Sequence, residues 1–513
     1  MRNLARNWLL PDRWALLALL LGMMAVFGFA PFNFSPATLV AVAGLFWLWG
    51  RSQNLAEAFK LGLWFGLGQF GLGVSWVFSS IYFHSDIGLP GSIILVILFV
   101  VTLALFPAIA AVTARYFFNA KLPGWGLMTV FPAAWVLLEW VRSLVFGGVP
   151  FLLIGTSHLG TWLDGYATVL GVLGVSFSLA ITAGVMVWFF QYKQKLTGAL
   201  IIAFIWPIGG VLQKTQWVEP VGEPIQVALL QGNVPQEIKW RSEQFIPMMR
   251  QYIAMTRGNL DADLIVWPET AIPGYFDQVA NGPLKQFVQD AQLQGTDILV
   301  GAVTRDSSAD KYYNSMINLR DLSQEYRKRH LVMFGEYYPF SELIEPLAQA
   351  FNFPFSQFSG GDKNQPLLTL AGHKVGVSVC FEMMFGSELA RDLPQAQYFV
   401  TSSNDAWFAH TLEPAQLLQE AQMRARELGR EIARATNTGH TAIIGVDGQI
   451  KAQIPAYQPG VLRGEIQPYE GMTPYARWTN WPVLIILFSI FGFILAKRYA
   501  YTGKLSNPFN RKK

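Results

Sequence analysis

The chain has 513 residues, of which 52% are hydrophobic and only 14% are charged. A soluble protein of average composition carries about a quarter charged residues, so this composition excludes an ordinary soluble protein. The formal net charge of +4 is small and no basic patch with interleaved aromatic residues is present, which argues against a nucleic-acid partner.

Eight apolar segments approach the length of about 20 residues that a helix needs to cross a bilayer. They lie near residues 13–32, 35–50, 57–82, 89–114, 123–143, 163–190, 197–213 and 480–497. The first segment has no small-residue cleavage site, so we expect an anchor rather than a removable signal peptide. The pattern predicts a polytopic α-helical membrane protein with about eight transmembrane helices.

The basic residues fall on one side of this arrangement. The loops near 31–36 and 83–89 contain no Lys or Arg, whereas the alternate loops and both ends of the chain are basic. The basic set is Arg2, Arg6, Arg13, Arg51, Lys60, Arg115, Lys121, Lys193, Lys195, Lys497, Arg498, Lys504, Arg511, Lys512 and Lys513. Because short basic loops stay in the cytoplasm, we expect both termini to be cytoplasmic and the segment between spans seven and eight to be outside.

Two ionisable residues lie within the fifth predicted span. Glu139 and Arg142 are three residues apart, so they share one helix face and can form a structural ion pair near the outer interface. The apolar loop that follows contains Pro150 and Phe151, and it can dip into the lipid and frame a substrate entrance.

From about residue 224 the pattern changes to short apolar strands that alternate with helices, which is typical of a buried α/β sheet. Strands are predicted at 225–230, 264–267, 298–303, 315–319, 375–379, 398–402 and 441–446, and helices near 241–258, 283–294 and 412–430. We therefore predict a transmembrane domain (1–213), an extracytoplasmic catalytic domain (214–475), and a last helix with a basic tail (476–513).

Three chemically reactive residues follow or adjoin these strands. Glu269 directly follows an apolar strand, Lys328 lies in a Tyr-Arg-Lys-Arg-His-Leu run, and Cys380, the single cysteine, ends another strand. A partly buried carboxylate there would make a useful base. Taken singly, each residue also has an ordinary explanation: a solvated Glu, a charged sheet edge, or a cysteine that only packs. The scattered His residues show no metal-ligand spacing.

In order and spacing, however, the three motifs resemble the nitrilase superfamily, which pairs a Glu, a Lys and a Cys in this sequence context. The resemblance implies an α/β nitrilase-like αββα sandwich for about 220–470. It further implies that Glu269, Lys328 and Cys380 form a catalytic triad.

Over essentially the whole chain the sequence is more similar to the apolipoprotein N-acyltransferase family. The shared pieces are 231–236, 312–315, 403–408, 434–439 and 473–478. Two departures are Met333, where the family has Pro, and Phe151, where an aromatic that is usually Trp follows Pro150. Neither touches the triad.

The resemblance implies transfer of a fatty acyl chain from a membrane phospholipid, through a Cys380 thioester, to the N-terminal amine of diacylglyceryl-modified apolipoproteins. The implied location is the bacterial inner membrane, with the catalytic domain on the periplasmic side and no cofactor or metal. Glu269 would be the base, while Lys328 and the backbone N–H of Phe381 would hold the oxyanion. The alternatives are a membrane-anchored nitrilase or amidase with the same triad, and a transporter or receptor with a degenerate outer domain.

Seven further residues are candidates for supporting roles. Glu336 and Glu382 are expected to orient Lys328 or the incoming amine, or simply to form buried ion pairs. The aromatic candidates for substrate binding, any of which could equally be core residues, are Trp240, Tyr337, Phe358, Trp407 and Phe408.

Overall fold

The computed structural model describes residues 11–118, 123–306, 308–339, 346, 357–408 and 410–506. The described chain divides into two compact units. Unit 1 comprises the residues up to Gly73, Ile97–Lys214 and those from Trp478 on, and unit 2 comprises Val74–Val96 and Thr215–Arg477. Of the basic residues used to predict orientation, Arg2, Arg6, Lys121 and the three at 511–513 lie outside the described residues.

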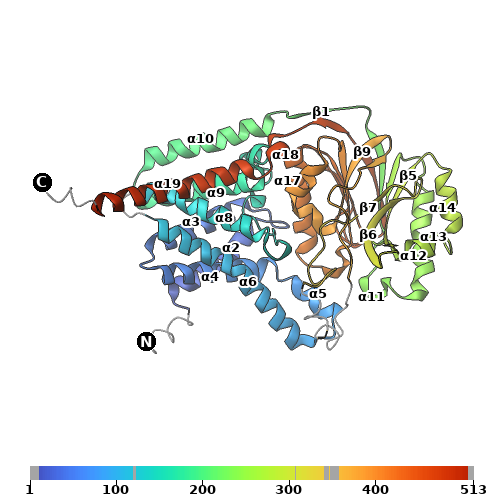
Figure 1. Ribbon diagram of the computed structural model, residues 1–513, viewed down its shortest axis with the longest axis horizontal. Helices are drawn as coiled ribbons and strands as arrows, with labels where there is room; N and C mark the ends of the chain where they lie inside the picture. The colour runs from blue at the N-terminus through green and yellow to red at the C-terminus, as the bar shows by residue number, and fades with distance from the viewer. Residues whose placement is uncertain are drawn as a thin grey trace. The chain divides into compact units, whose positions relative to one another are not determined.

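Unit 1 is built from apolar helices (Figure 1). Its principal helices are α2 (Arg13–Val26), α3 (Ser35–Arg51), α4 (Leu55–Gly73), most of α6 (Gly88–Phe117), α8 (Phe131–Arg142), α9 (Ala167–Gln191), α10 (Lys195–Lys214) and α19 (Trp481–Ser506). Shorter turns are α7 (Pro123–Trp125), η1 (Gly126–Val130), η2 (Val145–Gly147), η3 (Thr156–His158) and η4 (Trp162–Tyr166). Each predicted apolar segment therefore contains a helix.

Fewer of these helices qualify as membrane spans than the sequence predicts. In the described parts of the chain, four helices are long and apolar enough, namely Gly88–Phe117, Trp162–Gln191, Lys195–Lys214 and Trp481–Tyr499. A fifth is possible if α4 and the next helix, α5 (Val77–His84), form one span bent by 58°. Helices α2 and α3 have 14 and 17 residues, which is short for a bilayer that needs about 20. The structure supports a set of membrane-spanning helices, and the number eight stays a prediction.

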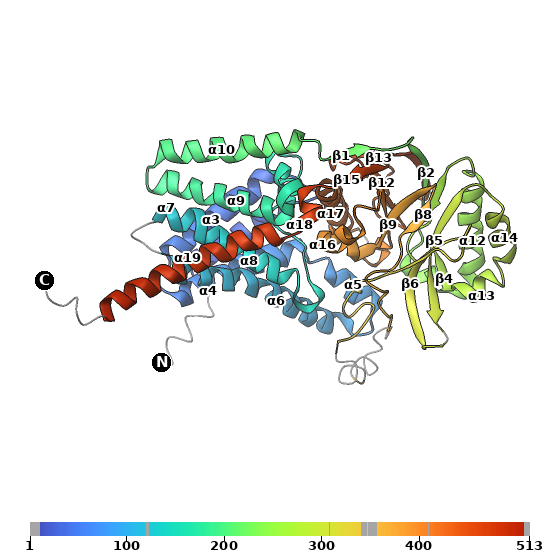
Figure 2. The ribbon, with the colours of Figure 1, turned by 45° about the horizontal axis from the view of Figure 1, so that its top comes forward.

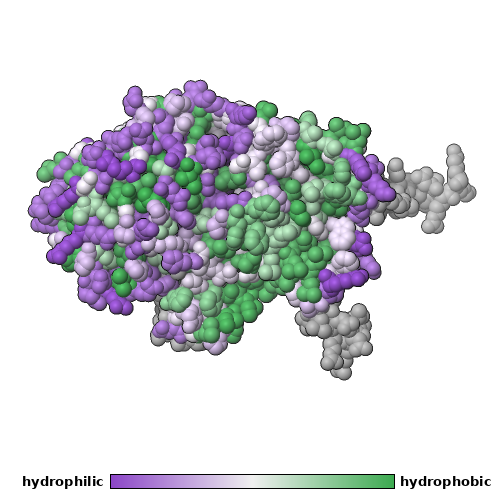
Figure 3. Space-filling model, turned by 180° about the vertical axis from the view of Figure 1, so that it is seen from behind, coloured by the Kyte–Doolittle hydropathy of each residue, from purple (hydrophilic) through white to green (hydrophobic). Residues whose placement is uncertain are grey.

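The surface of unit 1 fits a lipid environment. Figure 3 shows apolar side chains gathered in a broad area over its helices, whereas the face of unit 2 in that view is mostly hydrophilic. Helix α6 also has exposed apolar side chains, among them Ile97, Leu98 and Leu105, each more than a third exposed. Water would penalise so much contiguous apolar surface, whereas acyl chains do not.

Unit 2 contains two large sheets. Within the described residues, the seven-stranded sheet runs β14-β2-β3-β5-β6-β7 with β4 beside β5, and the six-stranded sheet runs β13-β12-β11-β10-β9-β8. The first consists of β2 (Ile225–Gln231), β3 (Leu264–Val266), β4 (Ile272–Tyr275), β5 (Asp297–Asp306), β6 (Lys311–Asn318), β7 (Glu325–Arg327) and β14 (Gly460–Ile466). The second consists of β8 (Leu368–Leu370), β9 (His373–Val379), β10 (Tyr398–Ser403), β11 (Ile432–Thr436), β12 (Ala442–Ile444) and β13 (Ile450–Gln453). A separate pair joins β1 (Val218–Pro220) to β15 (Tyr469–Gly471).

Helices cover the outer face of each sheet (Figures 1 and 2). Helices α12 (Ser242–Arg257), α13 (Phe276–Ala280) and α14 (Lys285–Gln292) share an apolar core with the seven-stranded sheet. Helices α17 (Glu413–Leu428) and α18 (Pro474–Trp478) share another with the six-stranded sheet. A third core, containing Val266 and Val379, lies between the sheets. These three cores make an αββα sandwich.

The sequence predicted seven of the fifteen strands described in this domain. Each of the seven predicted strands overlaps an observed one, and the three predicted helices match α12, α14 and α17 within a few residues. The central strand β11 was missed because it carries Arg434 among its apolar residues. Arg434 is fully buried and its Nη2 lies 3.2 Å from Oδ2 of Asp405, so a tertiary ion pair permits a charge where an apolar residue is expected.

The short helix α5 belongs to unit 2. Trp76, just before it, donates from Nε1 to Oε1 of Gln416 at 3.0 Å and packs edge-on against Phe408. His84, at its end, packs edge-on against Trp407, with 4.8 Å between ring centroids. The segment between two apolar helices is thus fixed to η7 (Asp405–Phe408) of unit 2.

Candidate active site

Glu269 sits on a rigid turn after β3. The preceding Trp267 is fully buried and stacks between Tyr252 and Phe287, with centroid distances of 4.9 and 5.8 Å. The Glu269 side chain is buried, and its two oxygens accept separate hydrogen bonds. Asn314 Nδ2 donates to Oε1 at 2.7 Å, and the backbone N–H of Asn404 donates to Oε2 at 2.9 Å. These contacts hold the carboxylate in one orientation.

Lys328 follows β7 and is 1% exposed. Its Nζ lies 2.8 Å from Oε2 and 2.9 Å from Oε1 of Glu336, and 3.9 Å from Oε1 of Glu269. Asn314 bridges the two carboxylates, because its Nδ2 also donates to Glu336 Oε1 at 3.0 Å. The result is a buried lysine between two carboxylates, one firmly paired with it and one slightly farther away.

Cys380 is the first residue after β9 and begins the short helix η5 (Cys380–Met384). Its φ is +55°, a left-handed conformation that costs a non-glycine residue about 1–3 kcal/mol and that clusters at functional sites. The sharp turn lifts the thiol out of the strand direction. Since β9 belongs to the six-stranded sheet and β3 and β7 to the other, Cys380 and the two charged residues that act on its thiol, Glu269 and Lys328, come from opposite sheets.

The ionisation of these groups is interdependent. Burial raises the pKa of the Cys380 thiol well above its ordinary value; the charge of Glu269 raises it further, and Lys328 opposes this. Burial also raises the pKa of Glu269, against the opposing charge of Lys328. Burial alone would lower the pKa of Lys328, but Glu336 and Glu269 raise it overall. Lys328 is therefore a permanent cation, and the thiol needs a base to become a thiolate.

Glu382 organises the backbone around the cysteine. It is buried and accepts hydrogen bonds from the N–H groups of Val379 at 2.7 Å, Arg329 at 2.7 Å and His330 at 3.0 Å. The hydroxyl of Tyr326 donates to both of its oxygens, at 2.9 and 3.0 Å. Glu382 thus ties the segment on either side of Lys328 to the end of β9.

Three of the residues predicted to support catalysis or bind substrate contact the segments that carry Lys328 and Glu336. They are Phe381, Tyr337 and Phe358. Phe381 packs edge-on against His330, with 5.9 Å between ring centroids. The backbone carbonyl of Tyr337 accepts from Phe334, and the N–H of Phe358 donates to the carbonyl of Glu336 at 2.9 Å. Tyr337 and Phe358 are therefore attached through their backbones to the segment that carries Glu336.

The other predicted aromatic residues come after β2 and after β10 in the chain. Trp240 follows the short helix α11 (Gln236–Lys239) and is 53% exposed. Trp407 and Phe408 are half-buried, and they contact the α5 segment as described above. None of the three has a recorded polar contact with the triad in the described chain.

Sequence reasoning gave no role to three residues that touch Glu269 or its turn. They are Asn314, Asn404 and Lys239. Asn314 and Asn404 lie in segments shared with the acyltransferase family, a signal that could have found them. Lys239 carries no such signal. Among the described residues, no three His, Cys, Asp or Glu side chains converge in a way that could hold a metal ion.

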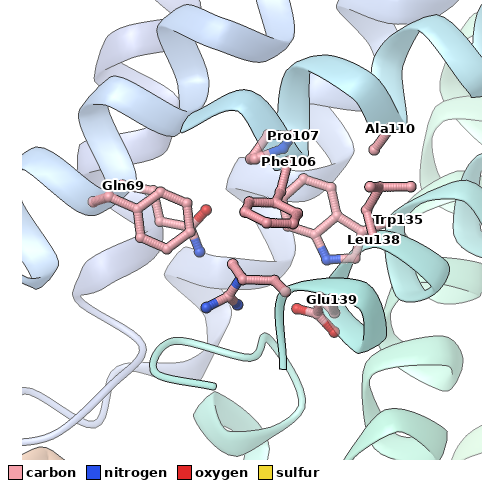
Figure 4. Close-up of a pocket in the computed structure, with 9 residues that line it drawn as sticks. Gln69, Phe106, Pro107, Ala110, Trp135, Leu138 and Glu139 are labelled. Atoms are coloured by element: carbon pink, nitrogen blue, oxygen red, sulfur yellow. The ribbon is translucent and has the colours of Figure 1, made fainter. Parts of the chain in front are cut away.

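Within unit 1, Glu139 and Arg142 line a pocket together with Gln69, Phe106 and Trp135 (Figure 4). Both charged residues form hydrogen bonds to the loop that follows α8. Glu139 accepts from the N–H of Ile154 at 2.8 Å, and Arg142 donates to the carbonyls of Val149 and Phe151. Their contacts therefore fold this loop back onto the helix that precedes it.

Comparison with known proteins gives two family matches and many full-length relatives. Residues 21–185 match the family model "Apolipoprotein N-acyltransferase N-terminal domain", and residues 226–475 match "Carbon-nitrogen hydrolase". A protein of Methylococcus capsulatus named apolipoprotein N-acyltransferase is 40% identical over 96% of this chain and 99% of its own length. Relatives of the same name from Nitrosomonas europaea and Coxiella burnetii are 37% and 35% identical, over 93% and 94% of this chain and 95% and 100% of their own lengths.

Proposed function

The chain belongs to the apolipoprotein N-acyltransferase family, and from that premise we propose that Glu269, Lys328 and Cys380 carry its acyl transfer. The donor is a membrane phospholipid and the acceptor is a diacylglyceryl-modified apolipoprotein. The observation that carries this proposal is the meeting of a buried carboxylate, a paired lysine cation and a strained cysteine across the two sheets.

In the first half-reaction, Glu269 removes the thiol proton and the Cys380 sulfur attacks the ester carbonyl carbon of the phospholipid. Lys328 and the backbone N–H of Phe381 stabilise the negative oxygen of the tetrahedral intermediate. The C–O bond then breaks, and Glu269 returns its proton to the departing alkoxide. The products are a lysophospholipid and an acyl-thioester on Cys380.

In the second half-reaction, the neutral α-amine of the lipoprotein attacks the thioester carbonyl. Glu269 accepts a proton from this amine as the C–N bond forms. The C–S bond breaks, and Glu269 reprotonates the sulfur. A thioester is a good acyl donor and the amide product is stable, so division into two steps lowers each barrier.

Glu336 fixes the Lys328 ammonium, while Glu382 fixes the backbone on both sides of the active site. We assign Trp240, Tyr337, Phe358, Trp407 and Phe408 to the walls of the path that the acyl chains follow. The exposure of Trp240 and the coupling of Trp407 and Phe408 to the α5 segment support this assignment.

We further propose eight spans, with both termini in the cytoplasm and residues 214–475 on the periplasmic side of the inner membrane. The distribution of Lys and Arg supports this orientation. It also suits the chemistry, because a phospholipid and a lipid-modified acceptor can both reach the catalytic domain by lateral diffusion in the outer leaflet.

A membrane-anchored nitrilase or amidase would use the same triad. The similarity to acyltransferases extends through the helical unit and over nearly the whole chain, which favours transfer over hydrolysis of a small amide. Hydrolysis of a soluble amide would not require the helical unit.

The decisive experiment is the intact mass of the purified enzyme after incubation with phospholipid, before any acceptor is added. We expect a mass increase of one fatty acyl group, on Cys380, that disappears when a diacylated lipopeptide is supplied. The Cys380→Ala variant should show neither the adduct nor transfer while it remains folded. Substantial transfer by this variant would refute the thioester mechanism.

A further inference from the structure

A second lysine is buried beside the turn that carries Glu269. Lys239, at the end of α11, is only 3% exposed. Its Nζ donates to the backbone carbonyl of Glu269 at 3.2 Å and to Oγ1 of Thr270 at 2.7 Å. Both acceptors belong to the turn itself. Lys239 therefore differs from Lys328, which faces the carboxylate.

The turn needs such support because its backbone is strained. Thr270 has a φ of +45°, in the left-handed region that a β-branched residue avoids. On its other side the turn rests on β5, where a Cβ on Gly301 would lie 2.4 Å from the carbonyl oxygen of Pro268. The turn is thus held between β5 and the Lys239 ammonium.

The charge of Lys239 also acts on the base. Burial lowers the pKa of Lys239 to about 7, and the negative charge of Glu269 opposes that shift. In return, Lys239 is one of the cations that lower the pKa of Glu269 against burial. Lys328 also lowers the pKa of Glu269, whereas Glu336 raises it. Glu413 and the Cys380 thiol interact electrostatically with Glu269 as well.

We propose that Lys239 is a positioning residue for acyl transfer, whose ammonium clamps the Pro268–Thr270 turn and so holds the Glu269 carboxylate against Asn314 and the Asn404 amide. This inference rests on the proposed role of Glu269 as the base. Lys239 does not itself touch the reacting atoms. It acts through the geometry and the charge environment of the base.

The test measures the rate of acyl-enzyme formation against pH, with the full-length enzyme, phospholipid and no acceptor, together with the unfolding temperature. The variants are Lys239→Met, Lys239→Arg and Thr270→Val. Lys451→Met is the matched control, since Lys451 also pairs within this domain, with Glu431 at 2.8 Å.

We expect Lys239→Met to slow acylation by about 100-fold, the typical effect of a small misplacement of a catalytic group. Loss of the positive charge raises the pKa of Glu269, so the acid limb of the pH profile should move to higher pH. Lys239→Arg should restore the position of that limb. Thr270→Val, which removes one acceptor and keeps the charge, should slow acylation by about 5-fold, the worth of one net hydrogen bond, without moving the limb.

If Lys239→Met lowers the unfolding temperature but leaves the acid limb of the pH profile in place, the inference is wrong. It is also wrong if Thr270→Val forms the acyl-enzyme at the wild-type rate. If Lys239→Met does not fold, the Thr270→Val rate decides. The role of Glu269 as the base is tested separately. If Glu269→Gln forms the acyl-enzyme at the normal rate, Glu269 is not the base, regardless of the results with the Lys239 variants.

Discussion

Three buried charged side chains, Glu269, Lys328 and Glu382, and the half-buried Glu336 have different hydrogen-bond partners around the thiol. Glu269 is held by two neutral donors, which leaves it able to exchange a proton, whereas Glu336 is committed to Lys328 by contacts of 2.8 and 2.9 Å. Both carboxylate oxygens of Glu382 accept hydrogen bonds from backbone N–H groups and from the Tyr326 hydroxyl. The same residue type thus occurs here as the proposed base, as a counter-ion and as a scaffold, according to its hydrogen-bond partners.

This division predicts different pH responses for two variants. Glu269→Gln should block thioester formation at neutral pH and recover part of it as the pH rises, because hydroxide then generates the thiolate. Burial, which the substitution leaves in place, raises the pKa of Cys380, so recovery should begin above the range of an ordinary thiol. Lys328→Met should lower the rate about 100- to 1,000-fold in both half-reactions without such recovery, since it lacks an oxyanion contact and not a base.

Acyl-enzyme accumulation against pH, followed by mass with and without a lipopeptide acceptor, measures both effects. A parallel pH response of the two variants would contradict the separate assignment of base and oxyanion stabiliser, even if all three residues remain essential.

At the scale of elements, the site depends on how closely β5 approaches the turn after β3. Gly301 lies where a Cβ would be 2.4 Å from the Pro268 oxygen and 2.8 Å from the Glu269 Cα. Both neighbours are backbone atoms, so they cannot move aside as a flexible side chain would. The position of the base is therefore set by strand packing as well as by its hydrogen bonds.

We predict that Gly301→Ala forces these two segments apart, destabilises the domain by about 1–3 kcal/mol and slows acylation. Gly295→Ala is the matched control, because nothing lies within 4 Å of a Cβ built there. Denaturant unfolding and the acylation rate check the prediction. If both glycine variants behave like the wild type, the turn is not held by close packing against β5.

At the scale of the whole molecule, the orientation in the membrane decides which lipids and proteins the enzyme meets. The single native cysteine makes this directly testable, since Cys380→Ala leaves a cysteine-free chain. Leu293, in the catalytic unit, is 86% exposed, and Gln194, in the turn between α9 and α10, is also exposed.

In the Cys380→Ala background, a cysteine at position 293 should react with a membrane-impermeant maleimide added to intact spheroplasts. A cysteine at position 194 should react only after the membrane is permeabilised, because its loop contains Lys193 and Lys195 and is expected in the cytoplasm. The opposite labelling pattern would reverse the orientation and remove the periplasmic lipoproteins as substrates.

The sequence by itself determined the helical segments of unit 1, seven of the strands of unit 2 and the family, and it proposed the reactive residues. Apolar period and length located each helical segment of unit 1, and continuous apolar strands located β2, β3, β5, β9 and β10, because burial on both faces leaves that pattern in the chain. The motifs around Glu269, Lys328 and Cys380, together with whole-chain similarity, identified the family. The local sequence carries this information because the order of apolar and polar residues shows which side chains avoid water. The residue types at the strand ends show which reactive groups are present there.

Only the tertiary structure decided the arrangement of the site. Glu269 and Lys328 follow strands of one sheet and Cys380 follows a strand of the other. The contacts that hold Glu269 come from Asn314, Asn404 and, through its turn, Lys239, which are far apart along the chain. The buried Arg434 made β11 invisible to a pattern of apolar residues, because its partner Asp405 lies on another segment. Pairings between distant polar groups depend on how strands stack and not on local propensity, so no reading of neighbouring residues could have supplied them.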